Sequence, residues 1–109
     1  MNNIKIFRAN RGEGKTQWLI DRINESEGTL YYIGGEATFN NVKRLYESVY
    51  NKVCPLLFAK WEDVLMSKNI CYFTDELISN IITVSNYKSY ILASNDPWYI
   101  TMTKEDFVN

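Results

Sequence analysis

The stretch that most constrains this 109-residue chain lies near its start, at residues 4–16, IKIFRANRGEGKT. An apolar strand ends in a turn that contains Gly12 and Gly14, and helical spacing follows Lys15 and Thr16. Glycine lets the backbone adopt positive φ and approach a ligand without a Cβ in the way. A tight loop that leads into a helix N-terminus aims several backbone N–H groups at one point, where the helix dipole also favours an anion. The stretch therefore predicts a strand, a phosphate-binding loop and a helix.

Each residue of this loop is a candidate contact to a bound phosphate. The expected binding residues are Ala9, Asn10, Arg11, Gly12, Glu13, Gly14, Lys15 and Thr16. Lys15 would reach the β- and γ-phosphates of a nucleotide, and the Thr16 hydroxyl would ligate Mg²⁺. The strict pattern G-x-x-x-x-G-K-[ST] has Ala9 in place of its first glycine. The alternative is a glycine-rich turn with an exposed lysine.

A second group of chemically useful residues comes at Ile70–Glu76, ICYFTDE. The largely apolar start suits a central parallel strand that is covered on both faces. Asp75 would hold Mg²⁺ opposite Thr16, while Glu76 would orient the water that attacks the γ-phosphate. The alternative is that the two carboxylates cap the next helix, expected at Leu77–Tyr87.

Hydrophobic periodicity predicts further elements along the chain. The expected helices are Lys15–Glu25, Asn41–Asn51 with an N-cap at Thr38, Trp61–Met66 and Leu77–Tyr87. The expected strands after the first, Ile4–Arg8, are Thr29–Ile33, Ile70–Thr74, Ser89–Ala93 and Trp98–Met102. Cys54–Phe58 fits either a short edge strand or an apolar loop. The inward side chains of the first two helices are expected to be Trp18, Leu19, Ile23, Val42, Leu45 and Val49.

Two strand ends are further candidates for the binding site, because ligands of open parallel sheets bind at the carboxyl ends of the strands. Asn95, after the strand Ser89–Ala93, could donate a hydrogen bond to the γ-phosphate or hold the attacking water. The alternative is an ordinary turn. The pair Gly34-Gly35 follows Thr29–Ile33 and could border the nucleotide, or could form a plain turn.

Composition places the chain among ordinary single-domain globular proteins. Apolar residues make up 46% of it and charged residues 23%, and its net charge is −1. Only Lys43 and Arg44 are adjacent basic residues, so nothing independent indicates nucleic-acid contact. The absence of histidine excludes imidazole catalysis and most zinc sites. Cys54 and Cys71 are expected to be free core residues. No stretch has the length of a membrane span, which predicts a cytoplasmic protein, in the host cytoplasm if the source is viral.

Taken together, the loop, Asp75-Glu76 and Ser94-Asn95 resemble one branch of the phosphate-loop NTPases. That branch has Walker A and Walker B motifs, an extra strand between the two motif strands, and a catalytic glutamate; it includes RecA-like, AAA+ and viral DNA-packaging ATPases. Residues 11–16, RGEGKT, look most like the loop of phage terminase large subunits. A terminase ATPase domain is, however, much longer and is followed by a nuclease domain.

The resemblance implies an α/β fold, a three-layer sandwich with a mostly parallel sheet of four or five strands. The implied order is Thr29–Ile33, Ile70–Thr74, Ser89–Ala93, Ile4–Arg8, with Trp98–Met102 beyond. It also implies ATP and Mg²⁺ as cofactors, and a catalytic set of Lys15, Glu76 and Arg11, the last acting in cis as an arginine finger.

The expected function is therefore a small Mg²⁺-dependent ATPase of phage type, coupled to nucleic-acid handling such as packaging or replication. Its expected partners are DNA or a DNA-handling complex, and a second copy of the chain. The alternative is a nucleotide-binding regulator with little hydrolysis that acts by binding a larger protein. A small kinase is disfavoured, because no arginine follows Arg44 to build a substrate lid. The chain has no guanine-specific Asn-Lys-x-Asp motif, which leaves ATP as the expected nucleotide.

Overall fold

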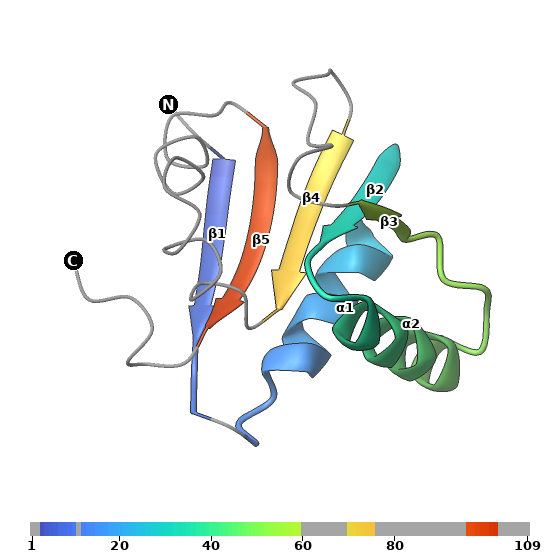
Figure 1. The fold of residues 1–109 in the computed structure, drawn as a ribbon, viewed down its shortest axis with the longest axis horizontal. Helices are drawn as coiled ribbons and strands as arrows, with labels where there is room; N and C mark the ends of the chain where they lie inside the picture. The colour runs from blue at the N-terminus through green and yellow to red at the C-terminus, as the bar shows by residue number, and fades with distance from the viewer. Residues whose placement is uncertain (1–2, 11, 60–69, 76–95, 103–109) are drawn as a thin grey trace.

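The computed structural model describes residues 3–10, 12–59, 70–75 and 96–102 (Figure 1). Its elements are β1 (Asn3–Arg8), α1 (Lys15–Glu25), β2 (Thr29–Ile33), α2 (Glu36–Tyr50), β3 (Leu57–Ala59), β4 (Ile70–Asp75) and β5 (Pro97–Met102). The described strands form one sheet in the order β1-β5-β4-β2-β3, and every neighbouring pair is parallel. The predicted α/β class with a mostly parallel sheet is thus confirmed.

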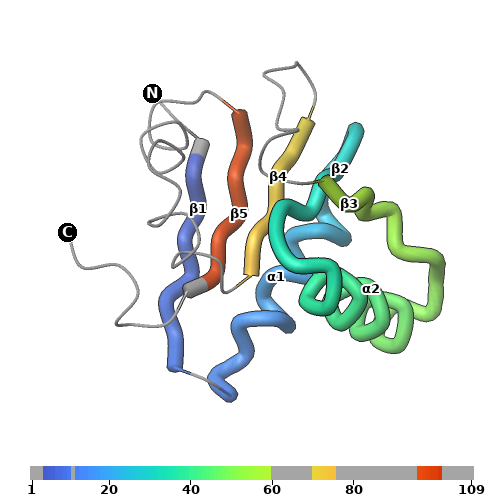
Figure 2. Tube along the Cα trace, viewed as in Figure 1, coloured from blue at the N-terminus to red at the C-terminus, as the bar shows by residue number. Residues whose placement is uncertain are grey.

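One face of the sheet carries both described helices, and the chain crosses to them at the lower ends of the strands as drawn in Figure 2. Buried side chains from both helices and from β2 and β4 form one apolar cluster between the helices and the sheet. Its members are Leu19, Ile20, Ile23, Leu30, Tyr32, Val42, Tyr46 and Phe73, with Cys54 and Leu56 from the segment before β3. This cluster holds α1 over the centre of the sheet, and with it the loop that precedes the helix.

The opposite face of the sheet is also apolar and buried. Its centre is a stack of Tyr72 on Trp98, with ring centroids 4.5 Å apart and an interplanar angle of 21°. Ile33 and Ile100 are buried beside this stack. Burial on both faces is typical of parallel sheets in layered α/β folds. The predicted helices Trp61–Met66 and Leu77–Tyr87 lie outside the described residues.

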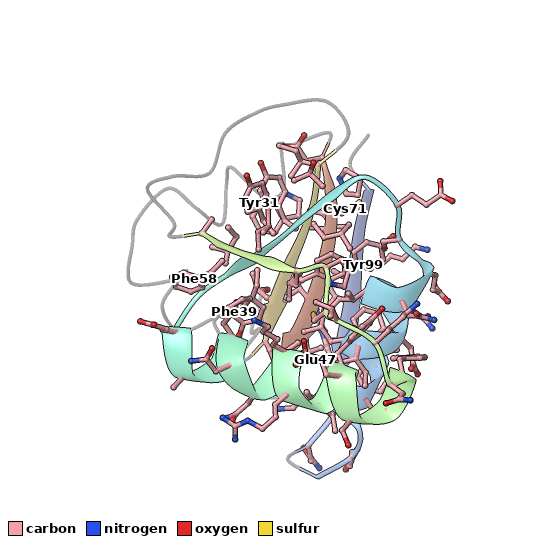
Figure 3. All side chains as sticks on the ribbon, turned by 90° about the vertical axis from the view of Figure 1, so that its right-hand side faces the viewer. Tyr31, Phe39, Glu47, Phe58, Cys71 and Tyr99 are labelled. Carbon is pink, nitrogen blue, oxygen red and sulfur yellow. The ribbon has the colours of Figure 1, made fainter. Side chains whose placement is uncertain are left out.

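The segment after α2 leads into β3, the edge strand beside β2, and this edge faces the viewer in Figure 3. Phe39 of α2 packs on Phe58 of β3, with ring centroids 5.3 Å apart, and the Glu47 carboxylate accepts a hydrogen bond of 3.1 Å from the Cys54 N–H. Cys54–Phe58 therefore supplies the start of an edge strand, one of the two alternatives. Cys54 and Cys71 are both free, as predicted.

Helix α2 differs from its prediction in where it begins and in which face it buries. It begins at Glu36, and its N-cap is Gly35, which has an extended backbone. Thr38 therefore lies inside the helix, and the predicted N-cap is wrong. Val49 is 47% exposed, whereas Tyr46 is buried. Tyrosine can bury its ring while its hydroxyl finds a polar partner. Here that partner is Asn24, whose side-chain oxygen lies 3.2 Å from the Tyr46 hydroxyl, so the apolar stripe runs through Tyr46 instead of Val49.

The predicted strand order is wrong at one point. The strand between β1 and β4 is β5, Pro97–Met102. The predicted order has this strand beyond β1 and has Ser89–Ala93 in the position that β5 occupies. Segment 89–95 lies outside the described residues. The physical reason is visible in β5 itself, because Trp98 and Ile100 face one core while Tyr99 packs against the other. A central strand requires apolar side chains on both of its faces.

Candidate phosphate-binding site

The turn between β1 and α1 has the backbone shape that the sequence predicted for it. Gly12 and Gly14 both adopt positive φ, 84° and 86°. This conformation costs residues that carry a Cβ free energy. The Glu13 N–H donates to the Asn10 carbonyl at 3.1 Å, which closes the turn, and the first helical bond of α1 then runs from the Trp18 N–H to the Gly14 carbonyl at 2.9 Å. The chain thus passes directly from the glycine turn into the helix.

Space and charge at this helix start both suit an anion. Among the described residues, no atom beyond the glycine and its chain neighbours lies within 4 Å of a Cβ added at Gly12 or Gly14. Gly14, as the N-cap, makes no side-chain capping hydrogen bond, and the first turn of α1 contains no acidic residue. The positive end of the helix dipole is therefore not offset by a carboxylate of the same turn.

Lys15 is the first residue of α1 and is only 5% exposed. Lysine is among the residues least often buried, because its ammonium loses hydration there. Its placement at the exit of the turn is the one the phosphate-binding hypothesis needs, since the long side chain starts beside the loop.

Asp75, the last residue of β4, accepts hydrogen bonds from side chains of three other elements. The Thr16 hydroxyl of α1 donates to its Oδ2 at 3.1 Å, and the Thr101 hydroxyl of β5 donates to its Oδ1. The Tyr32 hydroxyl of β2 donates to its backbone carbonyl at 3.4 Å. Asp75 is 4% exposed, and each of its two carboxylate oxygens accepts one of the threonine hydrogen bonds.

The donor set at this point fits a nucleotide-bound magnesium ion. Among the described residues, no group of three or more His, Cys, Asp or Glu side chains could hold a metal by itself. Mg²⁺ bound with a nucleotide takes one or two protein oxygens and completes its shell with phosphates and water. One carboxylate, Asp75, beside one hydroxyl, Thr16, is the oxygen set that such an ion requires.

The structure brings together only part of the predicted site. Five of the predicted residues lie at the edge of the sheet that is formed by the carboxyl ends of its parallel strands: Gly12, Gly14, Lys15, Thr16 and Asp75. The turn Gly34-Gly35 follows β2 at the same edge, because β2 pairs in parallel with β4. The predicted site residues Arg11, Glu76 and Asn95 lie outside the described residues.

Two residues that contact Asp75, Tyr32 and Thr101, were missed by sequence reasoning. For Thr101 a signal existed, since it is a polar residue near the end of an otherwise apolar run, WYITM at 98–102. The strand that contains it was placed at the outer edge of the sheet, away from Asp75. The Tyr32 contact had no comparable signal, because an aromatic residue in a strand is usually explained by core packing.

No family model, curated protein or solved structure matches this chain.

Proposed function

We propose that this protein binds ATP with Mg²⁺ at the turn formed by residues 9–16 and hydrolyses it. The observation that carries the proposal is the hydrogen bond between Thr16 and Asp75, 59 positions apart. These two residues were predicted from separate motifs to be the two protein ligands of one magnesium ion. Their contact supports the phosphate-loop interpretation over a plain turn and a plain helix cap, since neither alternative requires the two residues to meet.

In this proposal different groups of the loop contact the phosphates and the cation. The backbone N–H groups at the start of α1 donate to the phosphate oxygens, and the Lys15 ammonium neutralises part of their charge. The Thr16 hydroxyl donates its hydrogen bond to Asp75, which leaves the lone pairs of its oxygen available to a cation. A bound Mg²⁺ would supply charge neutralisation for the phosphates and a template that orients them.

For hydrolysis, the roles that we propose for three residues are inferred from the sequence alone. Glu76, next to Asp75 in the chain, is expected to orient and polarise the attacking water. Arg11 is expected to stabilise negative charge that develops on the transferring group, and Asn95 to hydrogen-bond the γ-phosphate or the water. Coupling of hydrolysis to DNA packaging or replication rests on the terminase-like loop sequence.

The experiment that tests the proposal combines a binding and a turnover measurement. Titration with a fluorescent ATP analogue, with Mg²⁺ and then with chelator, should show binding that Mg²⁺ strengthens. Phosphate release should be slow for the isolated protein and faster with DNA, RNA or an oligomeric partner. Absence of nucleotide binding in both conditions would refute the proposal.

The Glu76→Gln variant separates the ATPase from the nucleotide-binding regulator. For the ATPase, the variant should keep the wild-type affinity for ATP and lose phosphate release, because Glu76 acts on the water and not on ground-state binding. If the wild-type protein binds ATP and releases no phosphate with any partner, the regulator is the correct function. If turnover survives the change, Glu76 has no catalytic role.

A further inference from the structure

Strand β5 separates the two strands that carry the halves of the candidate site. The loop follows β1 and Asp75 ends β4, and neither strand pairs with the other in the described sheet. Thr101 of β5 lies in register with Phe7 of β1 on one side and with Asp75 of β4 on the other. Thr101 therefore lies between the strand that leads into the phosphate loop and the strand that carries the carboxylate.

Thr101 also makes a direct contact that the other buried threonine of the described sheet, Thr74, does not make. Its side chain is fully buried, and its hydroxyl donates to Oδ1 of Asp75. Thr74, one position before Asp75, is equally buried, yet its hydroxyl has no hydrogen-bond partner in the described structure. The two buried threonines therefore differ in that only Thr101 donates a hydrogen bond to the Asp75 carboxylate.

The two hydroxyls act on different oxygens of one carboxylate. Thr16 reaches Oδ2 from the helix side, and Thr101 reaches Oδ1 from within the sheet. The torsion about the Cβ–Cγ bond is broad for aspartate, so a hydrogen bond to each oxygen restricts rotation of the carboxylate more than one bond does. The bond from Thr101 to Oδ1 thus helps to keep Oδ2 beside Thr16, where a cation would be shared.

We propose that Thr101 is a positioning residue, which holds the Asp75 carboxylate in the orientation that a nucleotide-bound divalent cation needs. The inference rests on the proposed function, because it assigns a role toward the same cation. The contact that assigns this role to Thr101 is its hydrogen bond to Asp75. Thr101 acts through Asp75, as hydrogen-bond partners of metal ligands commonly do.

The test compares three variants by nucleotide binding. Thr101→Val keeps the branched shape and removes the hydroxyl, Thr101→Ser keeps the hydroxyl, and Thr74→Val makes the same buried change where no hydrogen bond is lost. For each, a fluorescent ATP analogue is titrated in chelator, and Mg²⁺ is then titrated into the complex. Thr101→Val should raise the Mg²⁺ concentration for half-saturation about tenfold, as loss of an outer partner of a metal ligand does.

The pattern across the variants distinguishes positioning from simple packing. Binding in chelator should stay at the wild-type level for Thr101→Val, while Thr101→Ser and Thr74→Val should match the wild type in both titrations. An unchanged Mg²⁺ midpoint in Thr101→Val would overturn the inference and leave the proposed function standing. A wild-type protein whose nucleotide binding ignores Mg²⁺ would overturn both.

A second readout does not depend on whether Thr101→Val folds. A buried hydroxyl that donates to a carboxylate exchanges its proton slowly, so the Thr101 hydroxyl proton of the wild-type protein should be visible by nuclear magnetic resonance. Its resonance should shift when Mg²⁺ is added to the nucleotide complex. A resonance that does not respond to Mg²⁺ would contradict the positioning role.

Discussion

Thr16 at the start of α1 and Asp75 at the end of β4 are joined by a hydrogen bond of 3.1 Å from hydroxyl to carboxylate. The contact places the exit of the glycine turn against the only strand end in the described structure that carries a buried carboxylate. An oxygen pair of this kind is what a magnesium ion takes from a phosphate-loop protein.

Replacing Asp75 by asparagine should remove the contribution of Mg²⁺ to nucleotide affinity. The amide keeps the size of the side chain but lacks the negative charge that a hard cation prefers. Asp21→Asn is the matched control, because Asp21 is another aspartate that accepts hydrogen bonds, from Gln17 of α1 and from Tyr50 of α2. Nucleotide titrations with Mg²⁺ and with chelator should coincide for Asp75→Asn and stay separate for Asp21→Asn. Retained Mg²⁺ dependence in Asp75→Asn would exclude this carboxylate from the metal site.

Gly14→Ala should cost both stability and binding, whereas Gly28→Ala should cost stability alone. Gly14 and Gly28 have similar positive φ, 86° and 90°. Because a Cβ is disfavoured in left-handed backbone, alanine at either position should destabilise the fold by about 1–2 kcal/mol. At Gly14 the methyl group would also enter the open space beside the loop. Urea unfolding and nucleotide titration of both variants check the comparison. Equal affinities for the two variants would show that the space at Gly14 does not hold a ligand.

The contact between α1 and α2 predicts a pH dependence at high pH. The Tyr50 hydroxyl donates to the Asp21 carboxylate, and this bond raises the pKa of Tyr50 from 10.0 to about 12. The protonated tyrosine is the bonded form, so its contribution to stability is complete below pH 10.0 and is lost as pH rises towards about 12. The difference in tyrosinate absorbance between wild type and Tyr50→Phe should therefore titrate well above the ordinary value. A midpoint at the ordinary tyrosine pKa would contradict this contact.

Arg11→Ala should lower kcat with little change in KM, if the arginine acts only when charge develops on the transferring group. Arginines supplied in this way are worth roughly 10³–10⁵ in rate. Arg8→Ala, at the end of β1, is the control. A loss of less than about threefold in kcat at Arg11 would be too small for an arginine finger and would leave a role in shaping the loop.

The sequence predicted most accurately the elements whose boundaries depend on local chemistry. The strand Thr29–Ile33 and the helix Lys15–Glu25 have the predicted bounds, because glycines flank the strand and the glycine turn precedes the helix. The meeting of Thr16 with Asp75 could also be anticipated, since both were expected at the carboxyl edge of a parallel sheet.

Relations between distant segments were harder to predict. Both Ser89–Ala93 and Trp98–Met102 have the composition of a strand, and nothing local says which one lies between β1 and β4. In the structure Trp98 of β5 packs on Tyr72 of the neighbouring strand β4, a contact between residues far apart in the sequence. The error in strand order also hid Thr101, whose hydrogen bond to Asp75 exists only because β5 is the inserted strand.

The affinity of the Lys15→Ala variant for ATP is the most direct test of the central claim, that the turn after β1 binds the phosphates of a nucleotide. Loss of a charge-assisted contact to the phosphates should weaken binding by well over tenfold. Lys15→Met, which keeps most of the buried stem, should show the same loss, and Lys43→Ala on α2 should bind as the wild type does. Titration of the fluorescent ATP analogue with Mg²⁺ should therefore give a much weaker dissociation constant for both Lys15 variants. Wild-type affinity in a folded Lys15→Ala protein would contradict the assignment of this turn as a phosphate-binding site.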